Sequence, residues 1–247
     1  LVPYPTITDS ARAVRVGGSD LAMCPIENSL QGAVTETVDL LIHEAGYAIT
    51  GEVNLGVVHN LMALPGVTLG DIRRVYSHPQ ALGQCQGWLA DHLPGVEAAA
   101  ALSTAGSVEQ AANDHTPSAA IAPRRAAGLY GADILVAGIQ DDDSNVTRFV
   151  VLATDDAKPT GSDKTSLCFS FDDDQPGLLY KVMGLFAVAD INLTKVESRP
   201  TREGLGRYYF LVDLEGHRSD PGVAGVMAEL ESVVSELKVF GSYPRFR

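Results

Sequence analysis

A hydroxyl and a guanidinium are adjacent at Thr147 and Arg148, where an apolar run predicts a β-strand. A guanidinium binds a carboxylate through two parallel N–H donors, and a hydroxyl can orient a leaving group or donate to it. Arginine is seldom fully buried unless it is paired, and the acids at 141–143 can supply that pair. Ligand binding is the interpretation we favour for residues 145–149.

Three other polar clusters have the same character: Pro-Ile-Glu-Asn-Ser at 25–29, Ser-His-Pro-Gln at 77–80 and Ser-Thr-Ala-Gly-Ser at 103–107. We expect each cluster to follow a strand and to open a helix. Backbone N–H groups at a helix N-terminus bind anions, and small side chains let a ligand approach the backbone. Together the four clusters predict one anion-binding pocket assembled from distant segments.

Each cluster also has a structural interpretation that the residues alone leave open. Ser77 and Gln80 fit a capping box with Ser77 as the N-cap, and an isolated histidine such as His78 is often a surface or hydrogen-bonding residue. Thr104 belongs to a Ser/Thr pair that suits an N-cap, and the Asn-Ser pair at 28–29 consists of turn formers. Capping and anion binding are compatible, because a capped helix N-terminus still offers N–H groups.

The composition is that of a soluble globular protein with one large or two ordinary domains: 247 residues, 45% hydrophobic and 20% charged. No apolar run reaches the roughly 18 residues that a membrane span needs. The three cysteines are far apart and odd in number, which predicts a reduced, cytosolic protein without a metal site.

The charge distribution restricts the possible partners. A net charge of −13 argues against nucleic acid, whose phosphates require a basic face. Residues 1–157 contain seven arginines, no lysine and eighteen acids, so their overall field repels an anion. An anion bound there needs a specific arginine and backbone N–H groups. A compositional bias toward Arg, Asp and Ala explains the missing lysine equally well.

Strands and helices alternate before residue 155, which predicts an open α/β sheet with ligands beyond the C-terminal ends of its strands. The predicted strands are 21–24, 53–59, 74–76, 96–101 and 119–122, and the predicted helices are 33–44, 77–89, 105–113 and 124–129. A polar segment with Pro and Gly at 155–163 predicts a domain linker. Beyond it we expect strands at 165–171, 191–198, 207–214 and 237–241, with helices at 178–189 and 223–235. That βαββαβ order is the ferredoxin-like arrangement.

These motifs resemble the prephenate dehydratase family with a C-terminal ACT regulatory domain. The stretches that carry the resemblance are 25–29 with Gly32, 77–82 with Gln84 and Cys85, 103–105, 147–149 and, in the second domain, 197–200. Gly177-Leu178-Leu179 stands where the family has a Gly-Ala-Leu run, which is a conservative departure. The resemblance covers essentially the whole chain.

The resemblance implies an α/β catalytic domain with two periplasmic-binding-protein-like lobes at 1–157, a linker at 158–164 and a ferredoxin-like ACT domain at 165–247. The family opens with a strand and a Gly-Thr-Phe loop that do not precede Leu1, so we expect the catalytic domain to be N-terminally incomplete. The implied reaction is the decarboxylating dehydration of prephenate to phenylpyruvate in the cytoplasm, a step toward phenylalanine. It needs no metal and no organic cofactor. Arogenate dehydratase and a non-catalytic small-molecule sensor are the alternatives.

The resemblance also assigns roles to residues. Thr147 is the implied proton donor to the leaving hydroxyl, although a free threonine is a weak acid and can also act by hydrogen bonding alone. Arg148 is expected to bind a carboxylate, and Phe149 to pack against the ring or fill the core. The implied substrate-binding set is Asn28, Ser29, Ser77, His78, Gln80, Thr104, Arg148 and Phe149.

The ACT part resembles an amino-acid sensor that pairs with a second copy and binds phenylalanine between them as a feedback inhibitor. A dimer through the ACT domains, assembled further into a tetramer, is expected. On the residues alone, Glu197-Ser198-Arg199 is equally a solvated strand end. The implied phenylalanine-binding residues are Gly177, Leu178, Leu179, Asn192, Leu193, Glu197, Ser198 and Arg199.

Overall fold

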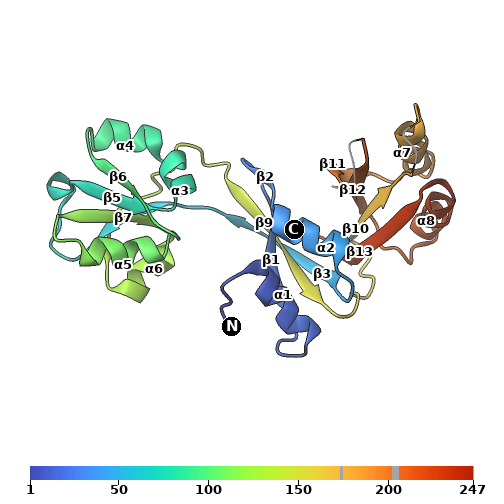
Figure 1. The fold of residues 1–247 in the computed structure, drawn as a ribbon, viewed down its shortest axis with the longest axis horizontal. Helices are drawn as coiled ribbons and strands as arrows, with labels where there is room; N and C mark the ends of the chain where they lie inside the picture. The colour runs from blue at the N-terminus through green and yellow to red at the C-terminus, as the bar shows by residue number, and fades with distance from the viewer. Residues whose placement is uncertain (173–174, 202–205, 247) are drawn as a thin grey trace. The chain divides into compact units, whose positions relative to one another are not determined.

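The computed structural model describes residues 1–172, 175–201 and 206–246. The chain divides into two compact units (Figure 1). The first unit combines Leu1–Leu55 with Thr147–Arg247, and the second unit is Gly56–Val146. No helix among the described residues is long and apolar enough to cross a membrane.

The second unit is built on a five-stranded mixed sheet in the order β6-β5-β7-β4-β8. Its strands are β4 (Asn60–Ala63), β5 (Arg74–Ser77), β6 (Glu97–Ala100), β7 (Ser118–Ala122) and β8 (Asp133–Ala137). Strands β5, β6 and β7 run parallel, whereas β4 is antiparallel to both β7 and β8. Its helices are α3 (Pro79–Gln84), α4 (Gln86–His92), α5 (Gly106–Asn113) and α6 (Arg124–Tyr130), with a 3-10 turn η1 at Leu69–Asp71.

Helices cover both faces of this sheet. Cys85 and Leu89 pack with one set of strand residues, and Val108 and Ala126 pack with the other. Figure 1 shows α3 and α4 on one side and α5 and α6 on the other. Because both faces are covered, every residue of β7 is buried, and its sequence Ser-Ala-Ala-Ile-Ala is small and apolar.

The N-terminal part of the first unit carries a four-stranded sheet in the order β2-β1-β9-β3. The strands are β1 (Ala22–Asn28), β2 (Gly32–Ala33), β3 (Ala48–Gly56) and β9 (Val146–Ala153), and the helices are α1 (Ile7–Arg15) and α2 (Thr35–His43). Strand β9 pairs antiparallel with β1, so that Thr147 faces Asn28 and Arg148 faces Glu27. This register places the predicted chemical residues of two distant segments next to each other.

The C-terminal part of the first unit has the predicted βαββαβ order, which confirms the ferredoxin-like arrangement. Its elements are β10 (Asp163–Ser170), α7 (Leu178–Val188), β11 (Leu193–Pro200), β12 (Tyr208–Glu215), α8 (Pro221–Val233) and β13 (Glu236–Pro244). The strands form an antiparallel sheet in the order β11-β12-β10-β13. Helices α7 and α8 cover one face, where Phe169, Phe186 and Leu230 are fully buried (Figure 1).

The other face of this C-terminal sheet packs against the N-terminal part of the same unit. Cys168, Leu211 and Phe240 lie in one apolar core with Leu41 and Ile49. The backbones approach so closely that a Cβ added to Gly241 would lie 2.3 Å from the carbonyl oxygen of Ile49. Only glycine fits there, so β13 and β3 are in direct contact.

Several boundaries differ from those that the sequence predicts. The predicted helix at 77–89 is two helices, because the chain breaks at Cys85. Helix α1 and strands β2, β4 and β8 were not predicted. The expectation that residues 27–29 open a helix is wrong, since Glu27 and Asn28 end β1 and are followed by the short strand β2.

Candidate functional site

The side chains of Asn28 and Thr147 meet at the ends of strands β1 and β9. Nδ2 of Asn28 donates a hydrogen bond of 3.0 Å to Oγ1 of Thr147. The amide oxygen of Asn28 accepts from the backbone N–H groups of Leu30 (3.1 Å) and Gln31 (3.2 Å). These backbone donors fix the amide with its nitrogen toward Thr147.

This arrangement leaves Thr147 able to donate. A hydroxyl has one hydrogen and two lone pairs, and Asn28 uses a lone pair. The hydrogen of Thr147 is therefore left for another acceptor. The amide donor also stabilises negative charge that develops on Oγ1, which lowers the cost of giving the proton away.

Arg148 points to the opposite face of β9 from Thr147, because side chains alternate along a strand. Its Nε donates to Oε2 of Glu52 (2.7 Å), its Nη1 to Oδ2 of Asp213 (2.5 Å) and its Nη2 to the hydroxyl of Tyr243 (2.8 Å). Burial lowers the pKa of Arg148, but Tyr243, Asp213 and Glu52 outweigh that effect and keep the pKa above its ordinary value. The guanidinium is a charged group with protein partners on all three of its nitrogens.

Two expectations about Arg148 change with this geometry. Thr147 and Arg148 do not project into one pocket, since they leave β9 on opposite faces. The acids at 141–143 do not pair with Arg148 either. Asp141 instead accepts from the backbone N–H groups at the start of α4, Asp142 from Ser144 and Asp143 from Gln140.

Phe149 shares a face of β9 with Thr147, because the two residues are two positions apart. It is half-buried, and its partner across the ladder on β1 is Pro25. Alternation therefore leaves Phe149, and not Arg148, on the side of the strand that carries the Asn28–Thr147 hydrogen bond.

The predicted capping box with Ser77 as the N-cap and Gln80 at the third position is wrong, because the helix begins one residue later and Gln80 occupies its second position. His78 is the N-cap of α3: its Nδ1 accepts from the backbone N–H of Gln80 at 3.3 Å, with Pro79 at the first helical position. Ser77 ends β5, is fully buried, and donates to the carbonyl oxygen of Ile121 at 2.7 Å. Because Nδ1 of His78 accepts, its Nε2 carries a hydrogen that can donate. Gln80 is exposed.

The cluster at 103–107 follows β6, the parallel neighbour of β5. Oγ of Ser103 accepts from the backbone N–H of Gly106 at 2.9 Å, and Ser107 donates to the carbonyl of Thr104 at 2.6 Å. Since Ser77 and Ala100 are partners at the ends of β5 and β6, His78 and the half-buried Thr104 follow the same sheet edge. The clusters at 77–80 and 103–107 therefore both lie beyond the C-terminal ends of parallel strands, as predicted.

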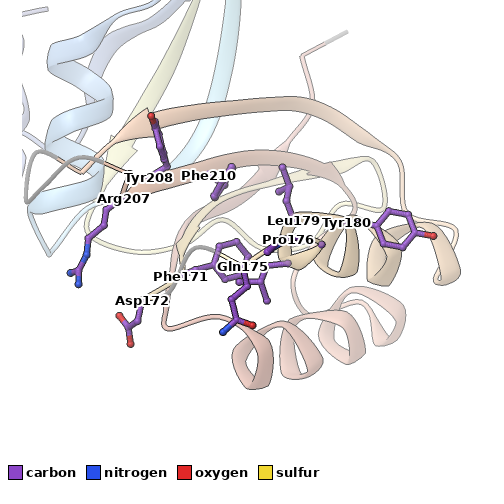
Figure 2. Close-up of a pocket in the computed structure, with 12 residues that line it drawn as sticks. Phe171, Asp172, Gln175, Pro176, Leu179, Tyr180, Arg207, Tyr208 and Phe210 are labelled. Atoms are coloured by element: carbon purple, nitrogen blue, oxygen red, sulfur yellow. The ribbon is translucent and has the colours of Figure 1, made fainter.

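A pocket of about 720 Å³ lies on the C-terminal sheet of the first unit, between the start of α7 and the start of β12 (Figure 2). Its walls include the aromatic rings of Phe171, Tyr208 and Phe210. Figure 2 shows Arg207 and Asp172 at one end of the pocket and Tyr180 at the other. The pocket thus combines an aromatic wall with one positive and one negative side chain.

The predicted effector residues divide into two groups. Gly177, Leu178 and Leu179 line the pocket. The others, on or next to β11, are not among its lining residues: Asn192, Leu193, Glu197, Ser198 and Arg199. Side chains alternate along β11, and its half-buried positions lie on the face where Lys195 and Arg199 pair with Glu27 and Asp39 of the N-terminal part.

Glu197 and Arg199 are two of those half-buried positions. Glu197 pairs with Lys195 at 3.1 Å, and Arg199 pairs with Asp39 of α2 at 3.1 Å. The pocket's aromatic and charged lining at Phe171, Arg207 and Phe210 was not predicted. The alternating aromatic residues of the strand at 207–214 were the available signal.

Comparison with known proteins gives matches along nearly the whole chain. Residues 1–157 match the family model described as prephenate dehydratase, and residues 173–232 match that of the ACT domain. A bifunctional chorismate mutase/prephenate dehydratase of Aquifex aeolicus is 40% identical over 98% of this chain. Arogenate dehydratase 1 of Petunia hybrida is 41% identical over 98% of this chain. The chain spans 66% and 61% of the length of these two relatives, respectively.

A solved structure has the same fold. It is described as prephenate dehydratase in complex with L-Phe from Arthrobacter aurescens, and it is 35% identical with a TM-score of 0.90. The match covers 99% of this chain and 81% of that one. Since the prephenate dehydratase model covers more than half of the residues, this chain belongs to the prephenate dehydratase family of hydro-lyases and carries an ACT domain in its C-terminal part.

Proposed function

We propose that this chain converts prephenate to phenylpyruvate, carbon dioxide and water. The observation that carries the proposal is the hydrogen bond from Asn28 to Thr147, which leaves a hydroxyl able to donate in a chain of this family. Prephenate loses its ring carboxylate as carbon dioxide, and the electron pair of that bond enters the ring while the ring hydroxyl leaves. One proton is consumed to release the hydroxyl as water.

Thr147 is the proposed donor to the leaving hydroxyl. Aromatisation of the ring supplies the driving force, so the protein needs only to stabilise the oxygen as it departs. Asn28 supports Thr147 by donating a hydrogen bond to Oγ1, where negative charge develops as the proton leaves. A donor aimed at a developing oxyanion contributes about 10²- to 10³-fold in rate, and solvent then restores the proton.

The substrate-binding set that we propose differs from the predicted one at two positions. Asn28, Ser29, His78, Gln80 and Thr104 remain proposed donors to the substrate, and Phe149 is proposed to pack against its ring from the face that carries Thr147. Ser77 uses its hydroxyl within the sheet, and Arg148 uses its guanidinium within the protein. We assign neither side chain to the substrate.

The direct test is the formation of phenylpyruvate, followed by its ultraviolet absorbance after prephenate is added to the purified chain. Accumulation of phenylpyruvate in proportion to enzyme supports the proposal. A chain that binds prephenate without forming product is the non-catalytic sensor instead.

Arogenate dehydratase is the second candidate, because a plant relative of that name is 41% identical to this chain. Arogenate carries an amino group where prephenate carries a keto group, so its dehydration gives phenylalanine. Measuring kcat/KM for both substrates under the same conditions decides between them. We expect the larger value for prephenate.

The pocket between α7 and β12 is the proposed site for phenylalanine. Arg207 suits the carboxylate of an amino acid, Asp172 suits its ammonium group, and the rings of Phe171 and Phe210 suit an aromatic side chain. The relative from Arthrobacter aurescens was solved with L-Phe, which supports this choice. Phenylalanine acts as a feedback inhibitor if it binds the less active state of the enzyme more tightly than the active state, because it then shifts the equilibrium toward the less active state.

We further propose a cytoplasmic enzyme that dimerises through its ACT domains and assembles into a tetramer. The three cysteines are buried free thiols, which agrees with a reducing compartment. Light scattering on a size-exclusion column measures the assembly. A tetramer is expected with and without phenylalanine, and a monomer at micromolar concentration contradicts the proposal.

A further inference from the structure

Arg148 belongs to a buried charge network that joins the two parts of the first unit. Glu52 of β3 accepts from Arg148 and from Nζ of Lys164, which lies 2.9 Å from both carboxylate oxygens. Asp213 of β12 and Tyr243 of β13 hold the other two nitrogens of Arg148. Arg148 and Glu52 come from the N-terminal part, and the other three residues come from the ACT part.

The network is largely buried. Glu52 and Asp213 lie against Arg148, and Glu27 is a third carboxylate 3.7 Å from Nη1 of Arg148. The side chain of Arg148 is 12% exposed, and that of Glu52 is 3% exposed. Ser166 lies 2.5 Å from both Asp213 and the hydroxyl of Tyr243, which completes the polar contacts around them. Removing one member of such a network leaves a buried group without its partner, which is costly.

The network lies directly beside the proposed donor pair. Arg148 follows Thr147 on β9, and Glu27 precedes Asn28 on β1. Glu27 in turn forms an ion pair of 3.3 Å with Lys195 of β11 in the ACT sheet. Both members of the Asn28–Thr147 hydrogen bond therefore have a chain neighbour that is tied to the ACT sheet.

Strand β12 connects this network with the proposed effector pocket. Tyr208 and Phe210 line the pocket at the start of the strand, and Asp213 holds Arg148 near its end. A strand paired on both sides by β11 and β10 moves as a unit with them. One rigid element thus contacts both places, which is the physical condition for coupling between sites.

We propose that Arg148 is a positioning residue through which the ACT sheet sets the place of Thr147, with the ion pair of Glu27 and Lys195 doing the same for Asn28. This inference rests on the proposed function, because it names the route of regulation for that same site. Effector binding at the start of β12 shifts Asp213, and Arg148 transmits the shift to the adjacent residue on β9. The competing interpretation is that the network only holds the two parts together.

The test uses the full chain, because removing the ACT part would expose the apolar core that it shares with β3 and α2. Tyr243→Phe removes one hydroxyl from the network and keeps the ring. Lys195→Met removes the ion pairs to Glu27 and Glu197 without touching Arg148, and it serves as the second variant in case the first is unstable. Tyr76→Phe is the matched control, since Tyr76 donates to Asp114 and accepts from Arg74 in a charge cluster of the second unit.

Three quantities are measured on each variant: kcat and KM for prephenate, the fold inhibition by L-phenylalanine, and the hydrogen-exchange rate of β9 amides without any ligand. For Tyr243→Phe we expect kcat to fall about 3- to 10-fold, as for one lost hydrogen bond, with KM within about two-fold. Its inhibition by phenylalanine falls, and its β9 amides exchange faster. Lys195→Met shows the same changes to a smaller extent, and Tyr76→Phe shows none.

The exchange rates separate failure of this inference from failure of the proposed function. If the wild-type chain forms no phenylpyruvate, the proposed function fails, and faster β9 exchange in Tyr243→Phe still supports the link. If Tyr243→Phe and Lys195→Met keep wild-type kcat, inhibition and β9 exchange, the link is overturned, whatever their melting temperatures.

Discussion

Asn28 and Thr147 are direct partners across two antiparallel strands, with Nδ2 of Asn28 3.0 Å from Oγ1 of Thr147. The two residues are 119 positions apart in the sequence. The backbone N–H groups of Leu30 and Gln31 orient the amide, and the amide in turn makes Thr147 an acceptor on one side and a donor on the other. This relationship, and not a pairing of Thr147 with Arg148, is the basis of the proposed chemistry.

Asn28→Asp tests the donor side of this pair. The carboxylate can still accept from Leu30 and Gln31, but it takes the hydrogen of Thr147 and repels a dianionic substrate. We expect kcat/KM to fall about 10²-fold with the fold intact, measured by phenylpyruvate absorbance and circular dichroism. Asn113→Asp adds the same charge at the exposed end of α5 and serves as the control. Wild-type activity in Asn28→Asp would remove Asn28 from the mechanism.

Arg207→Gln tests the proposed effector pocket. Arg207 and Asp172 lie at the same end of the pocket. The change removes the positive charge there, so the carboxylate of phenylalanine loses its proposed partner. We expect the rise in melting temperature with L-phenylalanine to disappear while kcat without effector stays unchanged. Arg124→Gln, which removes an exposed arginine of α6, keeps the response. An undiminished thermal shift in Arg207→Gln would place the effector elsewhere.

Gly241→Ala tests the contact between β13 and β3. A methyl group there would lie 2.3 Å from the carbonyl oxygen of Ile49 and 2.7 Å from its nitrogen, both of which are backbone atoms. We expect a loss of more than about 2 kcal/mol in the free energy of unfolding, measured by urea denaturation. Gly225→Ala in α8 is the control, because its Cβ meets nothing within 4 Å and alanine gains about 1 kcal/mol in a helix. Equal stability of the two variants would contradict the close contact.

The buried thiols predict how stability changes at high pH. Burial raises the pKa of Cys24 to about 11 and that of Cys85 and Cys168 to about 12, above the ordinary value near 9. Above about pH 9 the unfolded chain loses these protons while the folded chain keeps them, so the free energy of unfolding falls as pH rises. At pH 8 we expect no reaction with a disulfide reagent until denaturant is added, and three thiols afterwards. A fast-reacting thiol in the folded chain would contradict this burial.

Much of the fold follows from local patterns in the sequence. The βαββαβ part was predictable because each element has its own periodicity and is bounded by turn residues, such as Pro176-Gly177 before α7. Strand β4, Asn-Leu-Met-Ala, is a four-residue run without β-branched residues, so no local signal identifies it. Strand β8 does carry Ile and Val, and α1 is preceded by the N-cap residue Thr6, so both had a local signal. For β4, the sheet that receives it decides its conformation.

The site was predictable only in part. The proximity of Asn28 and Thr147 follows from motifs that the family shares, but the partners of Arg148 lie 96 and 65 positions away and belong to different sheets. No local pattern indicates such a pairing. Strand alternation alone was enough to separate Thr147 from Arg148, because neighbouring residues of a β-strand face opposite sides.

The role of the Thr147 hydroxyl is measured by the rate of phenylpyruvate formation in the wild-type chain and in Thr147→Val, which keeps the shape and strand preference of threonine but has no hydroxyl. We expect turnover by the wild type and a kcat about 10²- to 10³-fold lower in Thr147→Val, with prephenate still bound. A kcat for Thr147→Val within two-fold of the wild type would contradict that role.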